Sequence, residues 1–394
     1  MSVVEIAPPS GHEGEQIRRG VAQPRLNILG IRGIPAQHGG FESFAAHFAP
    51  YMRDAGWAVT VYCQGKESQK RPTRSEDLWE GIHRVHFDTR SSGALATIEF
   101  DTKSVIDAAR KPGIDLVLGY NTAFLVLYQR LRGRKVVTNM DGIEWKRQKW
   151  NRFAKVWFWL NELIGGRFST ATIADHPGIA EHLSSRGCQA TSVIPYGSFA
   201  IRTADPAPLA QYGLVPDRYL ISICRIEPEN SIIELVSAFR QARTGLKMIV
   251  IGRLDPNNAY HRRVAKEGRD CVIFPGPIYD QDVVASLRFH SRAYLHGHQV
   301  GGTNPSLVEA LGARSLVIAH DNRFNRWTAG DTQFYFSSVL ECTRRMEQCA
   351  ALTSVQLSEY RQRSAERHER HFTLAAIHLQ YEALMAQVHG SSER

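Results

Sequence analysis

The strongest constraint on the fold is an alternation of short apolar segments with helix-length segments, which occurs twice along the chain. The first series runs from 25–31 (RLNILGI) to 191–194, and the second begins at 219–224. Short apolar runs at this spacing are typical of buried parallel strands joined by crossover helices. The Ala/Pro-rich stretch 195–216 separates the two series and predicts a hinge. We therefore predict an α/β protein with two doubly wound parallel-sheet domains that face each other across a cleft.

The length of the chain agrees with this division, because 394 residues are too many for one ordinary core. We expect a first domain at 24–198, a second at 199–371, and a final helix at 372–394 that returns toward the first domain. Residues 1–23 are polar and lack the apolar centre of a signal peptide, so we expect a disordered leader. The polar segment 66–81 predicts a mobile surface loop.

Composition narrows the function classes. The six cysteines are scattered without a C-x-x-C pair, which favours a reducing compartment and argues against a zinc knuckle or a disulfide framework. No apolar run reaches the length of about 18 residues that a membrane-spanning helix needs. A net charge of +9 predicts an anionic partner, such as nucleic acid, a lipid surface or a phosphorylated substrate. No recognised nucleic-acid module is visible, so we do not expect nucleic acid.

The segment 296–311 (HGHQVGGTNPSLVEAL) joins an apolar strand to a helix through a glycine-rich loop. Two adjacent glycines let the backbone approach a ligand closely, and the free N–H groups at the start of the following helix favour an anion. Thr303 or Asn304 can cap this helix, and Glu309 follows one turn later, where it can accept hydrogen bonds from hydroxyls. The segment predicts a cradle for a phosphate that carries a polyol. The alternative is an ordinary helix start with a solvated glutamate.

The first domain begins with a strand, a glycine-rich loop and a helix, but the loop lacks the dinucleotide fingerprint G-x-G-x-x-G. The second strand also ends at Gln64 rather than at an acidic residue that could bind a ribose. A nicotinamide enzyme is therefore not expected. In the second domain Arg225 follows a strand, where ligands bind in open parallel sheets. A guanidinium there can hold a diphosphate, although an ordinary surface arginine is the alternative.

Four segments taken in order resemble the retaining nucleotide-sugar glycosyltransferases of family 4, which have the two-domain fold called GT-B. More narrowly they are similar to the rhamnosyltransferase-like branch, and the similarity covers nearly everything after Leu26. The matching segments are 31–42 (IRGIPAQHGGFE), 141–147 (DGIEWKR), 225–230 (RIEPEN) and 296–311.

The resemblance implies transfer of a sugar with retention of configuration, through stabilisation of the leaving group rather than a protein nucleophile. It implies no metal and no cofactor, only a nucleotide-sugar co-substrate, with dTDP-rhamnose as one candidate. Catalytic roles are implied for Arg225, Asp141 and Glu144, the two acids contacting the acceptor. Donor contacts are implied for Gly39, Gly40, Arg32, Glu227, Asn230, His298, Gly301, Gly302, Thr303, Asn304 and Glu309.

Three departures from the family pattern leave questions open. Asn230 stands where the wider family has a lysine, so another cation, Arg32 or Arg253, would have to assist Arg225. Gln299 and Gly301 stand where glutamates are usual, which affects sugar recognition, and Met140 replaces a histidine. Asp141 with Gly142 is also an ordinary turn sequence. His296 and His298 have no third ligand nearby in the sequence, so we favour hydrogen bonding over a metal site.

The segment 145–160 interleaves cations with aromatic residues, as helices on anionic bilayer surfaces do. The alternative is an ordinary helix with a snorkelling polar face. We expect membrane contact from Lys146, Arg147, Lys149, Trp150 and Arg152. The resulting prediction is a cytoplasmic glycosyltransferase, peripheral at the inner face of the cell membrane. It would transfer a sugar to a saccharide acceptor, free or linked to polyprenyl diphosphate, in surface polysaccharide synthesis. A nucleotide-sugar epimerase and a binding protein without turnover are the alternatives.

Overall fold

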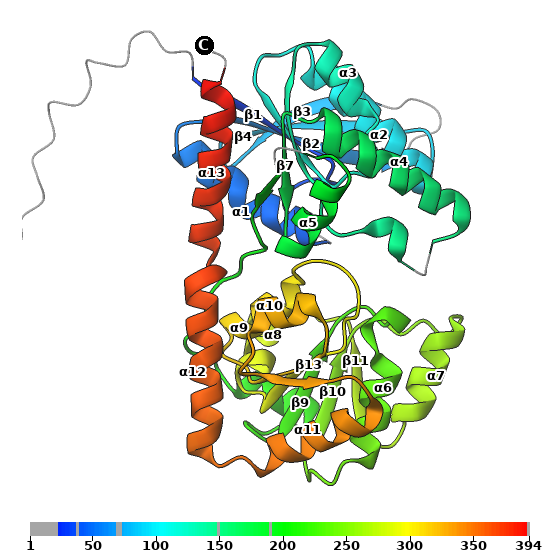
Figure 1. The fold of residues 1–394 in the computed structure, drawn as a ribbon, viewed down its shortest axis with the longest axis vertical. Helices are drawn as coiled ribbons and strands as arrows, with labels where there is room; N and C mark the ends of the chain where they lie inside the picture. Colours follow the sequence, from blue (N-terminus) through cyan, green and yellow to red (C-terminus); the bar gives the residue numbers. More distant parts are fainter. Residues whose placement is uncertain (1–22, 37–38, 68–72, 148–149, 189–190, 392–394) are drawn as a thin grey trace, which may run out of the picture.

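The computed structural model describes residues 23–391 except 37–38, 68–72, 148–149 and 189–190. It contains two α/β units stacked along the long axis, with a pair of C-terminal helices running beside both (Figure 1). The leader expected at 1–23 lies outside the described residues except for its last residue. Among the described helices, none combines the length and the apolar character needed to cross a bilayer.

The first unit is built on an eight-stranded sheet with the order β3-β4-β2-β1-β5-β6-β7-β8. Its strands are β1 (Arg25–Leu29), β2 (Ala58–Glu67), β3 (Arg74–Trp79), β4 (Ile82–Thr89), β5 (Ile114–Leu118), β6 (Lys135–Asn139), β7 (Ala171–Ala174) and β8 (Thr191–Val193). Its helices are α1 (Gly40–Asp54), α2 (Gly93–Ala108), α3 (Leu125–Leu131), the 3₁₀ turn η1 (Glu144–Lys146), α4 (Arg152–Phe168) and α5 (Pro177–Ser185). Pairing in this sheet is parallel except between β3 and β4.

The expectation of a mobile loop at 66–81 is wrong for the described part of that segment. β2 extends to Glu67, and β3 pairs with β4 in an antiparallel hairpin from Arg74 opposite Phe87 to Trp79 opposite Ile82. Glu80 and Gly81 turn the hairpin with positive φ angles of 48° and 74°. The strand escaped prediction because it lies at the sheet edge with both faces largely exposed, so its sequence carries no apolar alternation.

The second unit is built on a six-stranded parallel sheet with the order β11-β10-β9-β12-β13-β14. Its strands are β9 (Tyr219–Ile223), β10 (Lys247–Ile251), β11 (Val272–Gly276), β12 (Ala293–His296), β13 (Val317–His320) and β14 (Phe334–Phe336). Its helices are η2 (Ala207–Tyr212), η3 (Pro228–Asn230), α6 (Ile232–Gln241), α7 (Ala259–Gly268), α8 (Gln281–Phe289), α9 (Pro305–Gly312), α10 (Arg323–Ala329) and α11 (Val339–Ala351).

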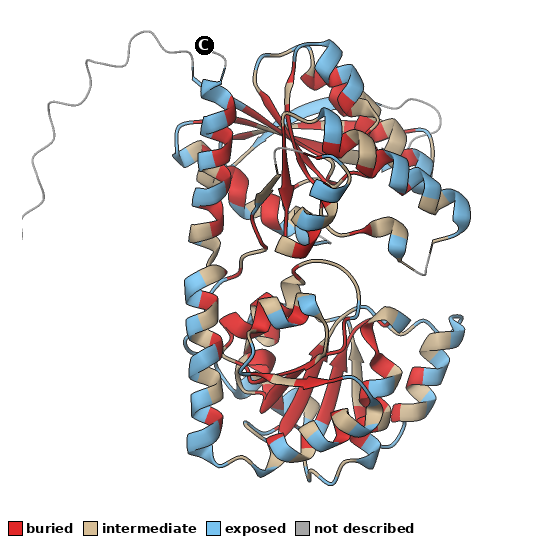
Figure 2. Cartoon of the chain, in the orientation of Figure 1, coloured by how far each residue is buried: buried red, intermediate tan, exposed pale blue. Residues whose placement is uncertain are grey.

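Two apolar clusters flank each sheet, one against each face, because the central strands alternate buried side chains between the two faces. Leu26 and Ile28 of β1, for example, pack on the face covered by α1, while Leu29 packs on the other. The central strands are accordingly buried in both units (Figure 2). The prediction of two doubly wound, Rossmann-like sheets is therefore confirmed.

The last two helices, α12 (Ser354–His371) and α13 (Leu374–Gly390), run beside both units (Figure 1, orange to red). On α13, Tyr381 packs against Phe44 and Phe48 of α1, with ring centroids 4.6 and 5.2 Å apart. Its hydroxyl accepts a hydrogen bond from Asn139 Nδ2 at 2.7 Å. A backbone bridge joins Ser198 to Thr373. The segment that leads from the first unit into the second therefore lies beside the junction of α12 and α13.

Candidate functional site

The loops after β6 and β7 of the first unit contact the loop after β12 of the second. A Cβ atom added to Gly142 would lie 3.6 Å from the Cα of Gly301 and 3.7 Å from the nitrogen of Gly302. A Cβ atom on Gly40 would lie 3.6 Å from Cγ of Pro305. Glycines on both sides therefore permit close backbone approach at this interface, which is where the sequence places the candidate site.

The glycine loop 297–304 leads from β12 into α9. Gly301 has a φ of 108°, a left-handed value that favours glycine. Asn304 caps α9, since its Oδ1 accepts a hydrogen bond from the Ser306 N–H at 3.0 Å. Thr303 has another partner, Asp175 of the first unit. Its N–H donates to Asp175 Oδ2 at 2.9 Å, and its hydroxyl donates to the Asp175 carbonyl oxygen at 2.5 Å.

Asp175 was not among the predicted site residues. It directly follows β7, so the strand-end reasoning that selected Arg225 could have found it. Burial and the neighbouring Asp141 raise the pKa of Asp175 well above its ordinary value, while the hydrogen bond from Thr303 lowers it. The structure thus adds a buried acid to the contact between the units.

His298 and Asn230 form a buried pair at the base of the glycine loop. Asn230 donates through Nδ2 to the Arg225 carbonyl oxygen at 2.7 Å, which leaves its Oδ1 facing His298 Nδ1 at 2.6 Å. That orientation puts the imidazole proton on Nδ1 and leaves Nε2 as an acceptor. Burial, with Arg147 and Arg225 nearby, lowers the pKa of His298 to about 4, so the ring is neutral at physiological pH. Neutral His298 can accept a hydrogen bond from a ligand hydroxyl.

Arg225 lies exposed in the loop that follows β9. Glu227 is half-buried in the same loop, and its N–H donates to the Arg225 carbonyl oxygen at 2.9 Å. Arg253, the other candidate cation of this unit, is exposed after β10. A guanidinium at a strand end that forms no ion pair with the described acids suits an anionic group such as a diphosphate.

Two acids of the first unit lie in the contact region. Asp141 has a positive φ of 47°, donates its N–H to Asn139 Oδ1 at 2.9 Å and accepts from the Tyr196 hydroxyl at 3.3 Å. Burial and Glu144 raise the pKa of Asp141 to about 6, although Arg147 and Tyr196 oppose the shift. A carboxyl that titrates close to neutral pH suits proton transfer or hydrogen bonding to a reacting hydroxyl.

Arg147, expected on a membrane face, points into the region between the units instead. Its guanidinium lies 2.6 Å from Glu144 and 3.5 Å from Glu229 of the second unit. Trp150 is half-buried, packs against Phe158 with the two rings tilted, and donates its Nε1–H to Glu144 at 3.1 Å. Lys146 and Arg152 are exposed, and Lys149 lies outside the described residues.

Glu309 lies one turn into α9, and its carboxylate pairs with Arg288 of α8. Arg288 also donates to the Ser306 hydroxyl at 3.3 Å. The Glu309 side chain keeps 41% of its surface exposed, so part of the carboxylate remains available to a ligand. Within the described chain, no group of three or more His, Cys, Asp and Glu side chains is placed to hold a metal ion.

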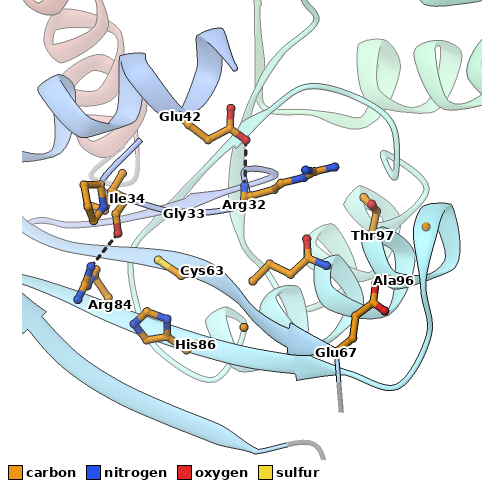
Figure 3. Close-up of a pocket in the computed structure, with 14 residues that line it drawn as sticks. Arg32, Gly33, Ile34, Glu42, Cys63, Glu67, Arg84, His86, Ala96 and Thr97 are labelled. Atoms are coloured by element: carbon orange, nitrogen blue, oxygen red, sulfur yellow. Dashed lines mark hydrogen bonds between the residues drawn. The ribbon is translucent and has the colours of Figure 1, made fainter. Parts of the chain in front are cut away.

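A cavity of about 630 Å³ opens in the first unit beside the glycine loop that precedes α1 (Figure 3). Glu42 accepts a hydrogen bond from the Arg32 N–H at 3.2 Å, and Arg84 donates to the Ile34 carbonyl oxygen at 2.8 Å. Arg32, a predicted donor contact, lines this cavity. A Cβ atom on Gly39 would meet Glu42 of this lining, whereas one on Gly40 would meet Pro305 of α9. Its polar lining residues are Arg32, Glu42, Gln64, Glu67, Arg84, His86 and Thr97.

Comparisons with known proteins bear mainly on the fold. Residues 24–199 match the family model described as "Domain of unknown function (DUF1972)". A comparison with curated proteins gives no match. Among solved structures, sucrose-phosphate synthase from Thermosynechococcus elongatus is 17% identical with a TM-score of 0.78, covering 94% of this chain and 100% of that one.

Two further solved structures show the same likeness. The α,α-trehalose 6-phosphate synthase from Burkholderia multivorans is 9% identical with a TM-score of 0.73, over 94% of this chain and 98% of that one. Anabaena HepE, solved with UDP and glucose, is 16% identical with a TM-score of 0.72, over 93% of this chain and 100% of that one. At these identities the likeness establishes the fold, which is the predicted GT-B arrangement.

Proposed function

We propose that the protein is a nucleotide-sugar-dependent glycosyltransferase, with the donor on the second unit and the acceptor on the first. The observation that carries this proposal is the meeting of both units at one site. The second unit contributes Arg225, the Asn230–His298 pair and the glycine loop, and the first contributes Asp141. The named activities of the similar structures, and the UDP and glucose bound to HepE, support the same reading.

In this proposal each group has one chemical task. Arg225 neutralises charge on the departing nucleoside diphosphate, because a guanidinium stays charged and binds phosphate oxygens bidentately. His298 accepts a hydrogen bond from a sugar hydroxyl through Nε2. Asp141 accepts one from the acceptor hydroxyl, with Glu144 adjusting its charge. Following the family resemblance, the acceptor attacks the same face of the sugar from which the nucleotide leaves, which retains the configuration.

The finer assignments concern donor and acceptor identity. We propose dTDP-rhamnose as the donor, on the basis of the four segments that resemble the rhamnosyltransferase-like branch. We propose a saccharide carried on polyprenyl diphosphate as the acceptor, in surface polysaccharide synthesis. The cavity beside Arg32 supports a saccharide acceptor, because its lining mixes guanidinium and amide donors with carboxylate acceptors. The side chain of Gln299 is bound within the second unit, where its amide donates a hydrogen bond to the Ser231 hydroxyl at 2.8 Å.

The test is a panel of nucleotide sugars, with donor hydrolysis and transfer to saccharide acceptors measured by product analysis. We expect turnover with a deoxyhexose donor, and we expect Arg225→Ala to reduce kcat/KM by roughly 100-fold. Arg243→Ala is the matched control, because Arg243 is an exposed arginine that precedes β10. It therefore lies toward the amino ends of the parallel strands, whereas Arg225 lies at their carboxyl ends. Acceptor-independent conversion of the sugar would instead show an epimerase, and donor binding without turnover would show a binding protein.

We also propose that the enzyme works at an anionic membrane surface, as a cytoplasmic peripheral protein, and we assign the contact to α3 and α4. The face of α4 opposite its buried residues carries Phe153, Val156, Trp157 and Leu160, which are 88%, 58%, 38% and 44% exposed. Their i, i+3, i+4, i+7 spacing would normally mark a core face. Here the core takes the opposite side of the helix, through Phe158 and its neighbours.

α3 extends this apolar face and cations frame it. Leu131 is 87% exposed, and Phe124 beside α3 contacts Trp157 edge-on at 5.6 Å. The exposed charged side chains within α3 and α4 are all basic: Arg130, Arg152 and Arg167. An apolar face whose exposed charged neighbours on α3 and α4 are all cations suits the headgroup region of an anionic bilayer.

Flotation with liposomes tests the membrane contact. We expect the protein to float with vesicles that contain phosphatidylglycerol more than with neutral vesicles, and less at high salt. Replacing Phe153 and Leu160 by Ser should abolish flotation, whereas Leu78→Ser should not, because Leu78 is a 72% exposed leucine on β3. Equal flotation of all three proteins would refute the assignment.

A further inference from the structure

The glycine loop 297–304 is held by both units at once. Its base belongs to the second unit, where Asn322 and Asn325 donate to the His298 carbonyl oxygen at 3.0 and 2.8 Å. The Gln299 N–H donates to the Glu229 carbonyl oxygen at 2.9 Å, which fixes the next residue. Its tip, in contrast, touches Gly142 and Asp175 of the first unit. Separation of the units would therefore leave the base in place and release the tip.

The contact at the tip is buried and has two points. Asp175 and Thr303 are each 2% exposed. The Thr303 N–H donates to the Asp175 carboxyl group, and the Thr303 hydroxyl donates to the Asp175 backbone carbonyl oxygen. Removing one partner of a hydrogen bond that is shielded from water costs more free energy than removing one partner of an exposed hydrogen bond. This pair is accordingly a specific connection between the first unit and the loop.

The fit of Asp175 depends on the glycine next to Thr303. A Cβ atom on Gly302 would lie 1.9 Å from Asp175 Oδ1, so the carboxyl packs directly on the loop backbone. Asp175 Oδ1 has no hydrogen-bond partner within the described residues and is buried. An uncompensated buried oxygen favours the neutral acid, whose carbonyl oxygen still accepts the Thr303 N–H.

We propose that Asp175 is a positioning residue that makes the geometry of the donor loop depend on closure of the two units. The loop takes its sugar-holding form only while Thr303 is bound to Asp175. This proposal rests on the proposed glycosyltransferase function. Asp175 acts through Thr303 and touches no substrate. The donor contacts Arg225 and Glu309 belong to the second unit and do not require this contact.

Kinetic constants separate this role from a structural one. We expect Asp175→Ala to lower kcat by roughly 10- to 100-fold, the usual result of a misplaced binding group, with nucleotide affinity within about threefold of wild type. Asp175→Asn should recover most of kcat, because its amide oxygen can accept the Thr303 N–H. Thr303→Val should lower kcat in the same direction and Thr303→Ser should restore it. The double variant Asp175→Ala/Thr303→Val should be slower than either single variant, because Asp175→Ala removes only the contact to the Thr303 N–H and leaves the backbone carbonyl that accepts the Thr303 hydroxyl.

Glu181→Gln is the matched control for losing a carboxylate at the contact between the units. Glu181 pairs with Arg323 at 3.2 Å, but the two side chains are 71% and 57% exposed, so we expect wild-type kinetics. A kcat per folded molecule that is unchanged in Asp175→Ala would overturn the proposal. So would an equal loss in Asp175→Asn and Asp175→Ala.

Small-angle X-ray scattering tests the contact without any assumption about the reaction. We expect a larger radius of gyration for Asp175→Ala than for wild type, and a wild-type value for Glu181→Gln. An unchanged radius in Asp175→Ala would overturn the coupling even if the enzyme transfers sugar. A wild-type protein that turns over no donor would instead refute the proposed function, and the scattering result would still decide the contact.

Discussion

The carboxamide of Asn230 lies between His298 and the backbone of Arg225, with its oxygen 2.6 Å from His298 Nδ1 and its nitrogen 2.7 Å from the Arg225 carbonyl oxygen. This pair fixes both the tautomer of a candidate sugar contact and the path of the chain beside a candidate phosphate contact. Asn230 is the position where the sequence lacks the lysine usual in the family that it resembles. The structure gives the asparagine a role of its own at this site.

Replacing Asn230 by Asp tests that role. A carboxylate beside His298 would raise the pKa of the ring from about 4, and it would place an acceptor against the Arg225 carbonyl oxygen. We expect donor affinity to fall and to become pH-dependent between about pH 5 and 8. NMR titration of the histidine together with donor binding at several pH values measures both effects. Asn258→Asp, at the cap of α7, should show neither.

Asp141 should impose a pH dependence on catalysis. Its pKa, raised to about 6 mainly by burial, means that the carboxylate forms as the pH rises from 5 to 7. If the ionised form accepts the acceptor hydroxyl, kcat/KM should increase over this range with an inflection near 6. Asp141→Asn should be slower and should lose that inflection. Persistence of the inflection in the variant would assign it to another group.

The same shift predicts the effect of Asp141 on stability. A carboxyl whose pKa is about 4 when unfolded and about 6 when folded favours the folded state when it is protonated. This contribution is complete below pH 4 and is lost as the pH rises through 6. Asp141→Asn should therefore gain stability relative to wild type at pH 8 but not at pH 4. Urea unfolding at the two pH values measures the difference.

Asp115 should be the most sensitive acid in the first unit. It is fully buried on β5, pairs with Arg134 and accepts hydrogen bonds from Asn27 at 2.8 Å and Gln129 at 2.9 Å. Asp115→Ala would leave the guanidinium buried without its partner, so we expect a loss of about 3–5 kcal/mol in the free energy of unfolding. Asp54→Ala removes an exposed ion pair with Arg53 and should cost less than about 1 kcal/mol. Equal losses would contradict the burial argument.

Acid should weaken the attachment of α13. His378 lies on α13 beside Phe44 and Phe48, and burial lowers its pKa to about 4. Because the unfolded ring binds a proton near pH 6.5, its contribution to stability is complete above pH 6.5 and is lost as the pH falls toward 4. Replacing His378 by Gln should reduce the loss of stability between pH 7 and 5 by roughly 1 kcal/mol. Thermal unfolding at both pH values provides the measurement.

The parts of the molecule that were predictable from sequence share one property, which is that their signals are local. The buried strands appear as apolar runs, and the glycine loop with its Asn304 cap is a contiguous motif. β3 carried no such signal, because an exposed edge strand needs no apolar face. Its Glu80–Gly81 turn was the available sign of a hairpin.

The contacts between the units were not predictable, because each depends on residues far apart in the chain. Arg147 appeared to belong to a basic surface, but its guanidinium lies 2.6 Å from Glu144 and 3.5 Å from Glu229 of the other unit. The proposed role of Asp175 depends on its contact with Thr303, which lies 128 positions later in the chain. Local periodicity says nothing about such pairs. The apolar stripe of α4 shows the same limit, since its spacing predicts a core face and the fold turns it to solvent.

The packing of α13 on the first unit also has a consequence for protein synthesis. Ile377, Tyr381 and Met385 are buried in the same cluster as β1 and α1, so the first core is completed by residues near the end of the chain. While the ribosome is still synthesising the second unit, the apolar surface of the first unit that α13 covers is exposed to solvent. A fragment ending at residue 199 should therefore bind a hydrophobic dye, and a synthetic peptide of residues 374–390 should displace the dye. Chaperone demand during translation would follow from this order of assembly.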